Sequence, residues 1–466
     1  MTDSTRRPNI LIVYPDQLRA DALSCSGNPC IKTPHVDRLA NEGVQFEHAF
    51  TSFPLCAPFR ASLLTGKYAH ANGMYANHYR IPLAQDFLAE ILRVNGYQTG
   101  YVGKWHLDGG AKHGYVPPGE RRLGFTTFVG FNRGHDYFGS IYYRDTPQPF
   151  TSKRFEPDYQ TEHLIEFMDQ AHRQDPGHPF FGMISYGPPH PPMLAPPHYL
   201  NLYSPDEVPI LPSTPKDEAW RTDARRFLAR YYGLVAAIDH NLGRLLDWLD
   251  QKNLAENTLV IFLSDHGEMA GEHGLYAKKT YYRSSMQVPM LIRYPARFST
   301  RRAVMELVDP SVDTMPTLLE MLDIPIPAAL QGKSFLSLLE GNDEPIRDHI
   351  YYEILKEMEG EERFPVPERG IRTKEWLYVR TEAAPKALFD LKDDPYEMAN
   401  LIGQSSHQKI QAELDTLLQA QMIALGDDWD KEAIFPPEDF HTHAEGVLVA
   451  REMRKVALVE DPDTSR

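Results

Sequence analysis

The sequence predicts an α/β fold, in which a large, mostly parallel sheet flanked by helices is followed by a smaller C-terminal α+β domain. Short β-branched or aromatic runs alternate with amphipathic helical patterns along most of the chain, which is typical of βα units. The composition turns polar and turn-rich at Gly341–Arg347, and short strand-like runs follow. A length of 466 residues suits one large and one small domain. We therefore expect a main domain over residues 1–344, a smaller domain over 345–426 and a C-terminal arm over 427–466.

The main sheet is predicted from five short apolar runs that are rich in β-branched and aromatic residues. They are Asn9–Tyr14, Gly100–Gly103, Phe180–Tyr186, Thr258–Ser264 and Met290–Arg293. Apolar residues recur at helical spacing in three other segments, which are Leu83–Asn95, Thr222–Gln251 and Ser311–Leu322. Pro316 is expected near the first turn of the last helix or at a kink, because proline removes a backbone hydrogen bond.

The smaller domain is predicted from short alternating runs that are followed by one helix. The expected antiparallel strands are His349–Tyr352, Arg369–Arg372, Leu377–Arg380 and Ala387–Asp390, and the helix is Gln408–Leu425. The stretch from Asp427 to Arg466 is acidic and contains prolines and aromatic residues, so we expect an arm or a cap. Such an arm could contact a neighbouring subunit, so a homo-oligomer is an open alternative.

The net charge of −16, without a long basic run, argues against nucleic acid or an anionic membrane as the main partner. A small anionic substrate stays open, because the local charge of a pocket can oppose that of the whole protein. No stretch approaches the roughly 20 apolar residues of a membrane span, and Asn9–Tyr14 is too short for a signal sequence. We expect a soluble cytoplasmic protein. The cysteines agree, because Cys25, Cys30 and Cys56 offer neither a disulfide framework nor zinc spacing.

Polar side chains directly follow four of the predicted strands. The clusters are Asp16-Gln17, Lys104-Trp105-His106, Pro188-Pro189-His190 and Asp265-His266. Taken alone, a strand-end Asp is often a turn or helix cap, and a strand-end His is often a surface residue. In open α/β sheets, however, ligands bind beyond the carboxyl ends of the strands, so four such clusters predict one site.

The carboxylates of this predicted site suggest a hard divalent cation. Asp16 and Asp265 offer oxygen ligands, and His266 or Gln17 would complete the set. Such ligands suit Ca²⁺ or Mg²⁺ better than a metal that prefers thiolates. Zinc with Asp and His ligands is an alternative that the residue types leave open.

The segment that begins at Cys56 reads Cys-Ala-Pro-Phe-Arg-Ala-Ser-Leu-Leu-Thr-Gly. A cysteine that opens a short helix can be an ordinary buried thiol or a nucleophile of low pKa. The Cys-x-Pro-x-Arg pattern followed by Leu-Thr-Gly resembles the signature of the sulfatase family, in which that cysteine is oxidised to formylglycine. The resemblance implies a sulfate-ester hydrolase with an alkaline-phosphatase-like main domain, acting on a small anionic substrate and matured by a formylglycine-generating enzyme.

Further motifs extend the resemblance over most of the chain. They are Asn9–Asp16, Gly103–Leu107, Ile238-Asp239, Ser264–Glu268 and Gln331–Ser334, and then Leu388–Leu391, Asp394-Pro395 and Asn400-Leu401 in the smaller domain. Two positions depart from the family pattern, because Phe59 replaces a common Ser and Gln17 a common second Asp. The Asp-Gln pair resembles the choline-sulfatase and phosphonate-monoesterase branches.

The resemblance implies a role for each site residue. The metal, expected to be Ca²⁺ with Mg²⁺ or Mn²⁺ as alternatives, would be held by Asp16, Gln17, Cys56, Asp265 and His266. Arg60 would stabilise the hydrated aldehyde, Lys104 and Lys278 would bind the sulfate oxygens, and Asn77 would contact the substrate. His190 would protonate the leaving group, and His106 would assist turnover of the sulfated intermediate. A solvated lysine at Lys278 and a turn asparagine at Asn77 are the plainer alternatives.

Formylglycine explains why a bare thiol would serve poorly. Hydration of the aldehyde gives two hydroxyls, of which one attacks sulfur and the second then expels sulfate by C–O cleavage. An unmodified cysteine has no group for the second step. A non-catalytic metal-binding protein with unmodified Cys56 is nevertheless an alternative.

A phosphonate monoester or phosphodiester hydrolase on the same scaffold is the second alternative. The pair Lys104 and His106 favours a sulfatase, because the phosphonate branch usually has neutral hydroxyl side chains there. The segment Gly109–Thr151 is expected to line the entrance, and a surface loop is the alternative. Its polar and aromatic candidates are His113, Arg121, Arg122, Asn132, Arg133, His135, Asp136 and Tyr137.

Overall fold

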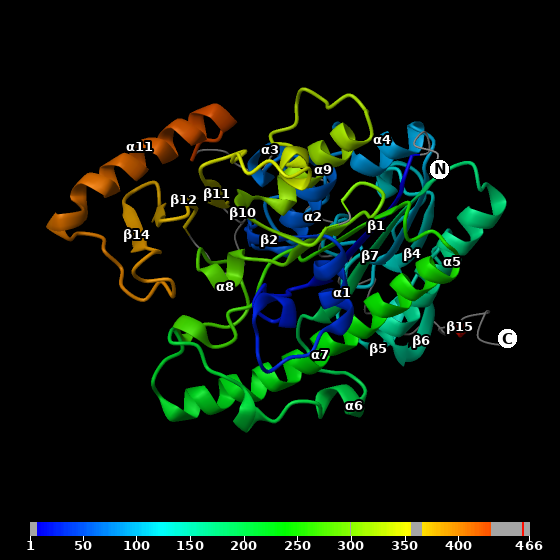
Figure 1. Cartoon of the computed structure of the whole chain (residues 1–466), viewed down its shortest axis with the longest axis horizontal. Helices are drawn as coiled ribbons and strands as arrows, with labels where there is room; N and C mark the ends of the chain where they lie inside the picture. The colour runs from blue at the N-terminus through cyan, green and yellow to red at the C-terminus, as the bar shows by residue number, and fades with distance from the viewer. Residues whose placement is uncertain (1–6, 299, 356–365, 430–458, 461–466) are drawn as a thin grey trace.

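The computed structural model describes residues 7–298, 300–355, 366–429 and 459–460 of the chain. At its centre, within these ranges, lies an eight-stranded sheet (Figure 1). In spatial order its strands are β10 (Arg302–Val308), β2 (Val44–Ala49), β9 (Met290–Arg293), β8 (Thr258–Leu263), β1 (Asn9–Asp16), β7 (Phe180–Pro189), β3 (Gln98–Lys104) and β4 (Thr127–Phe131). β9 is antiparallel to both neighbours and all other neighbouring pairs are parallel. This confirms the predicted large, mostly parallel sheet.

Helices cover both faces of this sheet, because alternate residues of each strand point to opposite sides. Ile10 and Ile12 of β1 belong to a cluster that includes α2 (Cys56–Thr65), α4 (Leu88–Val94), α9 (Pro310–Met321) and α10 (Leu336–Leu339). Leu11 and Val13 belong to a second cluster, with α1 (Pro34–Glu42), α5 (Glu156–Gln174) and α7 (Glu218–Gln251). The shorter elements are α3 (Ala69–Asn72), α6 (Pro197–Leu200), α8 (Arg283–Met286), β5 (Phe138–Tyr142) and β6 (Phe150–Phe155).

Two predicted helices have different starts in the structure. The segment predicted from Leu83 becomes helical only at Leu88, because the Gln85 side chain bonds to backbone carbonyls and holds the preceding residues in a turn. The long helix α7 begins at Glu218, earlier than predicted, because the Asp217 carboxylate accepts from Trp220 N at 2.8 Å and caps it. The strands β2, β4 and β10 were not predicted; β4 and β10 are the edges of the sheet.

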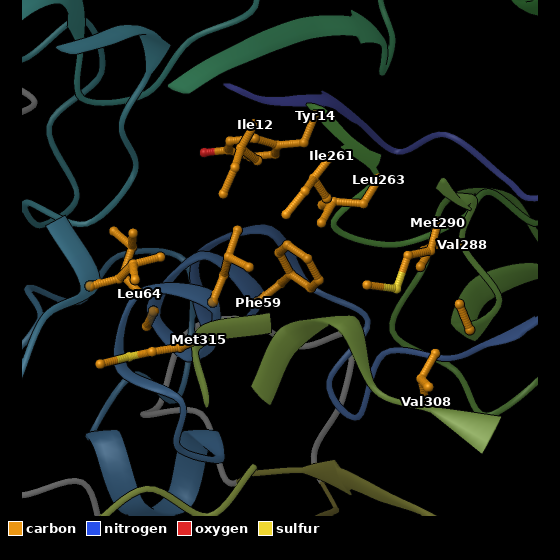
Figure 2. Packing of buried hydrophobic residues seen from close by; sticks show 14 of the residues in the cluster. Ile12, Tyr14, Phe59, Leu64, Ile261, Leu263, Val288, Met290, Val308 and Met315 are labelled. Atoms are coloured by element: carbon orange, nitrogen blue, oxygen red, sulfur yellow. The ribbon is translucent and has the colours of Figure 1, made fainter. Parts of the chain in front are cut away.

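The helix α2, which Cys56 opens, is buried along its whole length. Figure 2 shows Phe59 directed toward Ile261 and Leu263 of β8, with Met315 of α9 on the other side of α2. Phe59, one of the two departures from the family pattern, is therefore a core side chain. Gly66 ends α2 in the left-handed region, at φ 63°.

Pro316 lies in the interior of α9, which excludes the first turn, one of its two predicted places, while the alternative of a kink stays a prediction. Because proline has no N–H, the carbonyl of Val312 has no helical partner, and Gly332 packs against it. A Cβ atom at Gly332 would lie 1.8 Å from that carbonyl oxygen. The amides of Gln331 and Gly332 both donate to Gly66 O, at 2.9 and 3.1 Å. The Gln331–Ser334 motif thus joins the end of α2 to α9.

The smaller domain contains an antiparallel sheet of β11 (Ile350–Ile354), β12 (Glu368–Arg372), β13 (Trp376–Arg380) and β14 (Pro385–Asp390), with α11 (Gln408–Leu425) beside it. One face of this sheet belongs to the core of the main domain, through Tyr352, Val379 and Phe389 among others. The other face packs on Leu414 and Leu418 of α11. This confirms a smaller C-terminal domain, while its boundary near residue 345 stays a prediction.

The C-terminal arm lies outside the described residues beyond Trp429, apart from Val459–Glu460 (β15), which pairs with β6. Asp427, where the arm was predicted to begin, is buried and bonds to Arg369 and Tyr351 of the smaller domain. Across the part of the chain that the structure describes, no helix combines the length and apolarity needed to cross a bilayer. The cytoplasmic location stays a prediction.

Replacing Gly332 with alanine is expected to destabilise the fold by about 2 kcal/mol or more, because the new Cβ would overlap the Val312 carbonyl. Urea unfolding would measure the change. Gly177→Ala is the matched control, since its Cβ would meet only Asp175 Oδ1 at 3.4 Å, and it should stay within about 0.5 kcal/mol of wild type. Equal effects of both substitutions would contradict the close approach.

Asp239 of α7 accepts from the amides of His35 and Val36, at 3.0 and 2.8 Å, and so caps α1. Burial raises the pKa of Asp239 to about 7, above the value of about 4 expected in the unfolded chain. The folded state therefore binds the extra proton, and this group's contribution to stability falls as the pH rises from about 4 to 7.

Asp239→Asn keeps the acceptor oxygen but does not ionise. Between about pH 5 and pH 8, the free energy of unfolding of wild type should fall by about 1 kcal/mol or more relative to that of this variant. Denaturant titrations at both pH values would measure it. A difference between the two proteins that is independent of pH would count against a buried, ionising Asp239.

Candidate active site

The carboxyl ends of the neighbouring strands β8, β1, β7 and β3 bring together the four polar clusters that follow them. Asp16 and Lys104 end β1 and β3, and Lys104 Nζ donates to Asp16 Oδ2 at 2.6 Å. His190 N donates to Asp16 O at 3.1 Å, and Gln17 N donates to Asp265 Oδ1 at 2.8 Å. Segments far apart in the chain therefore meet at one edge of the sheet.

Four buried side chains at this edge form a cluster of potential metal ligands. One ligand atom each from Asp16, Cys56, Asp265 and His266 lies within 4.8 Å of the others. Cys56 Sγ is 3.6 Å from Asp16 Oδ1 and 3.3 Å from His266 Nε2. His266 Nδ1 donates to Gly267 O at 3.0 Å, so Nε2 is the nitrogen that faces the cluster. Two carboxylates and an imidazole nitrogen fit a divalent cation.

The guanidinium of Arg60 joins this cluster to the end of the sheet. Its Nη2 lies 3.2 Å from Asp16 Oδ2 and 3.4 Å from Asp265 Oδ2. Its Nη1 donates to the Tyr14 hydroxyl, the Ser185 hydroxyl and the Lys104 carbonyl, at 3.0, 2.6 and 2.7 Å. Arg60 is 1% exposed, so this buried charge is balanced by the two carboxylates and held by three oxygens of the strands.

The surrounding cations favour anionic groups in the cluster. Burial opposes the ionisation of Asp16, but Lys104 and the other nearby cations hold the pKa of this carboxyl well below its usual value. Burial and Asp16 likewise oppose ionisation of the Cys56 thiol, yet Lys104 and Lys278 lower its pKa. Negative charge at residue 56 is therefore stabilised.

Lys278 reaches the cluster through Gln17. Lys278 Nζ donates to Gln17 Oε1 at 2.5 Å, while Gln17 Nε2 donates to Glu268. Glu268 also accepts from the amides of Ala270 and Ala277, at 2.8 and 2.6 Å. The amide of Gln17 is thus oriented from both ends, and its oxygen faces Lys278. A metal-ligand role for Gln17 stays a prediction.

A cavity of about 340 Å³ opens beside Cys56. Its lining residues are Cys56, Asn77, Lys104, His106, Lys112, His113, Arg133, Gly134, His135, Asp136 and His190. Within the described part of the chain, both ring nitrogens of His106 are buried without a hydrogen-bond partner. Burial, together with the charges of Lys104 and Arg133, holds the pKa of His106 well below its usual value. Asn77 Oδ1 accepts from Ala57 N at 3.1 Å and so caps the start of α2.

The segment Gly109–Thr151 contributes to this cavity in part. His113, Arg133, His135 and Asp136 line it, as expected. The other candidates do not line it: Arg122 and Asn132 are buried and bond to loop carbonyls, Arg121 pairs with Asp108, and Tyr137 donates to the His190 carbonyl. These residues shape the loop rather than the entrance.

Three residues that the sequence analysis did not assign to the site position its functional side chains. Tyr14 and Ser185 hold Arg60, and Glu268 orients Gln17. Ser185 had a detectable signal, since it is a polar residue inside an apolar strand run, and Glu268 lies two positions after a predicted ligand. Tyr14 had none, because an aromatic residue is ordinary in a buried strand.

Comparison with known proteins identifies two family models. The model described as Sulfatase matches residues 8–324, and the model described as N-sulphoglucosamine sulphohydrolase, C-terminal, matches residues 271–424. The chain is 36% identical over 434 residues to the ulvan-active sulfatase of Formosa agariphila, covering 92% of this chain and 83% of that protein.

Solved structures agree with these matches. The crystal structure of yidJ from Bacteroides fragilis has a TM-score of 0.85 and 27% identity, over 92% of this chain and 98% of that one. BT4656, solved with its substrate D-glucosamine-2-N,6-O-disulfate, has a TM-score of 0.82 and 25% identity, over 92% and 100%. Phosphonate monoester hydrolase of Agrobacterium radiobacter shares the fold, with a TM-score of 0.76 and 24% identity over 89% and 96%.

The ligand cluster predicts that a divalent cation stabilises the folded protein. Addition of Ca²⁺, Mg²⁺ or Mn²⁺ to protein treated with a chelator should raise the melting temperature, by an amount that grows with ligand concentration. Asp265→Asn should abolish the rise, because it removes one anionic ligand but keeps the acceptor for Gln17 N. The exposed Asp206→Asn is the control. An unchanged response of Asp265→Asn would place the cation elsewhere.

Proposed function

This chain belongs to the sulfatase family and is a sulfuric ester hydrolase, and from that premise we propose that it cleaves its sulfate ester with formylglycine made from Cys56. The observation that carries the proposal is the position of Cys56. Its Sγ belongs to the ligand cluster with Asp16, Asp265 and His266, and the same residue lines the cavity. A group made at residue 56 can therefore contact a cation on one side and a substrate on the other.

The two cofactors have separate contributions in this proposal. Formylglycine supplies a hydrated aldehyde whose hydroxyls attack sulfur and later release sulfate, and a formylglycine-generating enzyme is the partner that makes it. The cation, which we propose is Ca²⁺, would be held by Asp16, Asp265, His266 and residue 56, and it would supply a Lewis acid that lowers the pKa of a hydroxyl on residue 56. With formylglycine at residue 56, three of the four ligand groups would offer oxygen, which supports Ca²⁺ over metals that prefer thiolates.

The protein's own cations orient the sulfate. Lys104 and Lys278 lie on two sides of the cluster, bonded to Asp16 Oδ2 and Gln17 Oε1. Each ammonium has further N–H groups that can donate to sulfate oxygens, where charge must be stabilised in the transition state. Arg60 is held by backbone and side-chain oxygens, so it is preorganised to stabilise the anionic form of residue 56.

His190 is proposed to protonate the leaving oxygen. Its Nδ1 donates to Pro191 O at 2.6 Å, which leaves Nε2 as the nitrogen that exchanges a proton at the cavity wall. Burial and Lys278 hold the pKa of His190 well below its usual value in the free protein. A bound sulfate anion offsets the nearby lysines, so substrate favours the protonated, acid form of His190. His106, on the same wall, assists the later release of sulfate.

Lys104 and His106 also favour sulfate over a phosphonate monoester. Both side chains line the cavity. The phosphonate monoester hydrolase of Agrobacterium radiobacter is similar to this chain in fold only. A substrate that carries one small anionic sulfate ester suits a cavity of about 340 Å³.

Hydrolysis of p-nitrophenyl sulfate tests this proposal. Cys56→Ala should lower kcat by at least about a thousandfold, because it removes the nucleophile. The half-buried Cys25, which does not line the cavity, is the control, and Cys25→Ala should keep wild-type turnover. The mass of the peptide that contains residue 56 would show whether the thiol has been converted to the aldehyde.

A phenyl phosphonate ester measured alongside separates the rival reaction. We expect a higher kcat/KM for the sulfate ester, and a clear preference for the phosphonate would reverse the assignment. A thiol that stays unmodified in protein from a host with the maturation enzyme, together with no turnover, would favour the non-catalytic alternative.

A further inference from the structure

His135 lies within the candidate active site although no role has been assigned to it. It comes from the loop between β4 and β5 and lines the cavity. Its ring is stacked on the ring of His190, with centroids 3.7 Å apart and planes 3° from parallel. Lys104 Nζ lies 3.2 Å from its Nε2. His135 therefore touches two residues that are proposed to act on the substrate.

The contact with Lys104 decides which nitrogen of His135 carries the proton. An ammonium group has donors and no acceptor, so Nε2 of His135 must accept from Lys104. Burial and the charge of Lys104 also hold the pKa of His135 well below its usual value, so the ring is neutral. A neutral ring that accepts at Nε2 carries its hydrogen on Nδ1.

The Nδ1–H group of His135 is buried and has no hydrogen-bond partner among the residues that the structure describes. A buried donor without an acceptor is unfavourable, so such groups are rare unless a ligand satisfies them. The ring has little freedom to turn away, because it is stacked on His190 and lies edge-on to Tyr137 at 6.3 Å. Tyr137 in turn donates to the His190 carbonyl, which holds the stacked pair in place.

We propose that His135 is a substrate-binding residue whose Nδ1–H donates a hydrogen bond to the sulfate-ester group in the cavity. The inference rests on the proposed sulfatase reaction at residue 56. The hydrogen bond would add a neutral donor to the cationic donors of Lys104 and Lys278. It would also fix the substrate beside His190, whose Nε2 must reach the leaving oxygen.

Two substitutions separate this role from simple packing. His135→Asn keeps an N–H donor near the δ position, whereas His135→Gln places its amide near the ε position, where it can accept from Lys104 but loses the δ donor. Both lose the stacked ring. His178→Asn is the matched control, because His178 is exposed and pairs with Asp175 away from the cavity.

Steady-state kinetics with p-nitrophenyl sulfate and inhibition by inorganic sulfate would be measured on the full chain of each variant. We expect His135→Gln to raise KM and the inhibition constant about tenfold, while His135→Asn stays within about threefold of wild type. Melting temperatures of the variants identify any that fail to fold. Equal changes in Asn and Gln variants that both fold, or no change in either, would overturn the proposal.

Failure of the proposed function would look different. If wild type did not turn over the sulfate ester, or Cys56→Ala were as active as wild type, the reaction would be wrong whatever His135 does. Calorimetric titration with inorganic sulfate would then still test His135, because binding needs no turnover. Weaker sulfate binding in His135→Gln than in His135→Asn would support the donor, and equal binding would exclude it.

Discussion

The two buried carboxylates at the carboxyl edge of the main sheet, Asp16 and Asp265, impose a charge balance on everything around them. Neither is solvated, so each needs cations or donors within bonding distance. Arg60 lies between the two, and Lys104 bonds to Asp16. These pairs still leave oxygen atoms of both carboxylates facing Cys56 and His266. A divalent cation there is the natural completion of the set.

The same balance explains how the rest of the fold contributes. Arg60 can reach the carboxylates only because α2 is seated between the sheet and α9, with Phe59 in the core. The end of α2 is in turn held by the amides of Gln331 and Gly332, which bond to Gly66. Apolar packing on one side of the sheet thus fixes the position of a polar group at its edge. A misplaced α2 would separate Cys56 from the other residues of the metal-ligand cluster and leave Arg60 buried without the carboxylates that balance its charge.

Three histidines of the site have ring orientations and tautomers that are set by a second hydrogen bond. His266 faces the ligand cluster through Nε2 because its other nitrogen bonds to a backbone carbonyl. His190 is set in the same way by Pro191, and His135 by Lys104. In each case a second hydrogen bond selects the tautomer and therefore the chemistry that the ring can perform. The cavity wall combines the neutral rings of His135 and His190 with lysines, which suits an anion that must bind and then leave.

The sequence by itself determined the chemistry and the main architecture of this protein. The segment that begins at Cys56 resembles the sulfatase signature, and that resemblance implied the chemistry. The strands of the central sheet have strong apolar patterns, which predicted the architecture. Edge strands such as β10 could not, because their mixed exposure weakens the pattern. The helix that begins at Leu88 was predicted to start too early. The Gln85 side chain donates to the backbone carbonyls of Asn72 and Pro82, and a pattern of apolar spacing contains no information on such bonds.

Only the tertiary structure decided which atoms meet. The amide of Gln17, whose role as a metal ligand stays a prediction, lies between Lys278 and Glu268, more than 240 residues away along the chain. His135 was one of eight candidates in a loop, and its contacts with Lys104 and His190 single it out. Charge pairing, tautomers and orphaned donors depend on distances between segments that are remote in sequence. Local composition carries no information on those distances, so the packed structure alone could supply them.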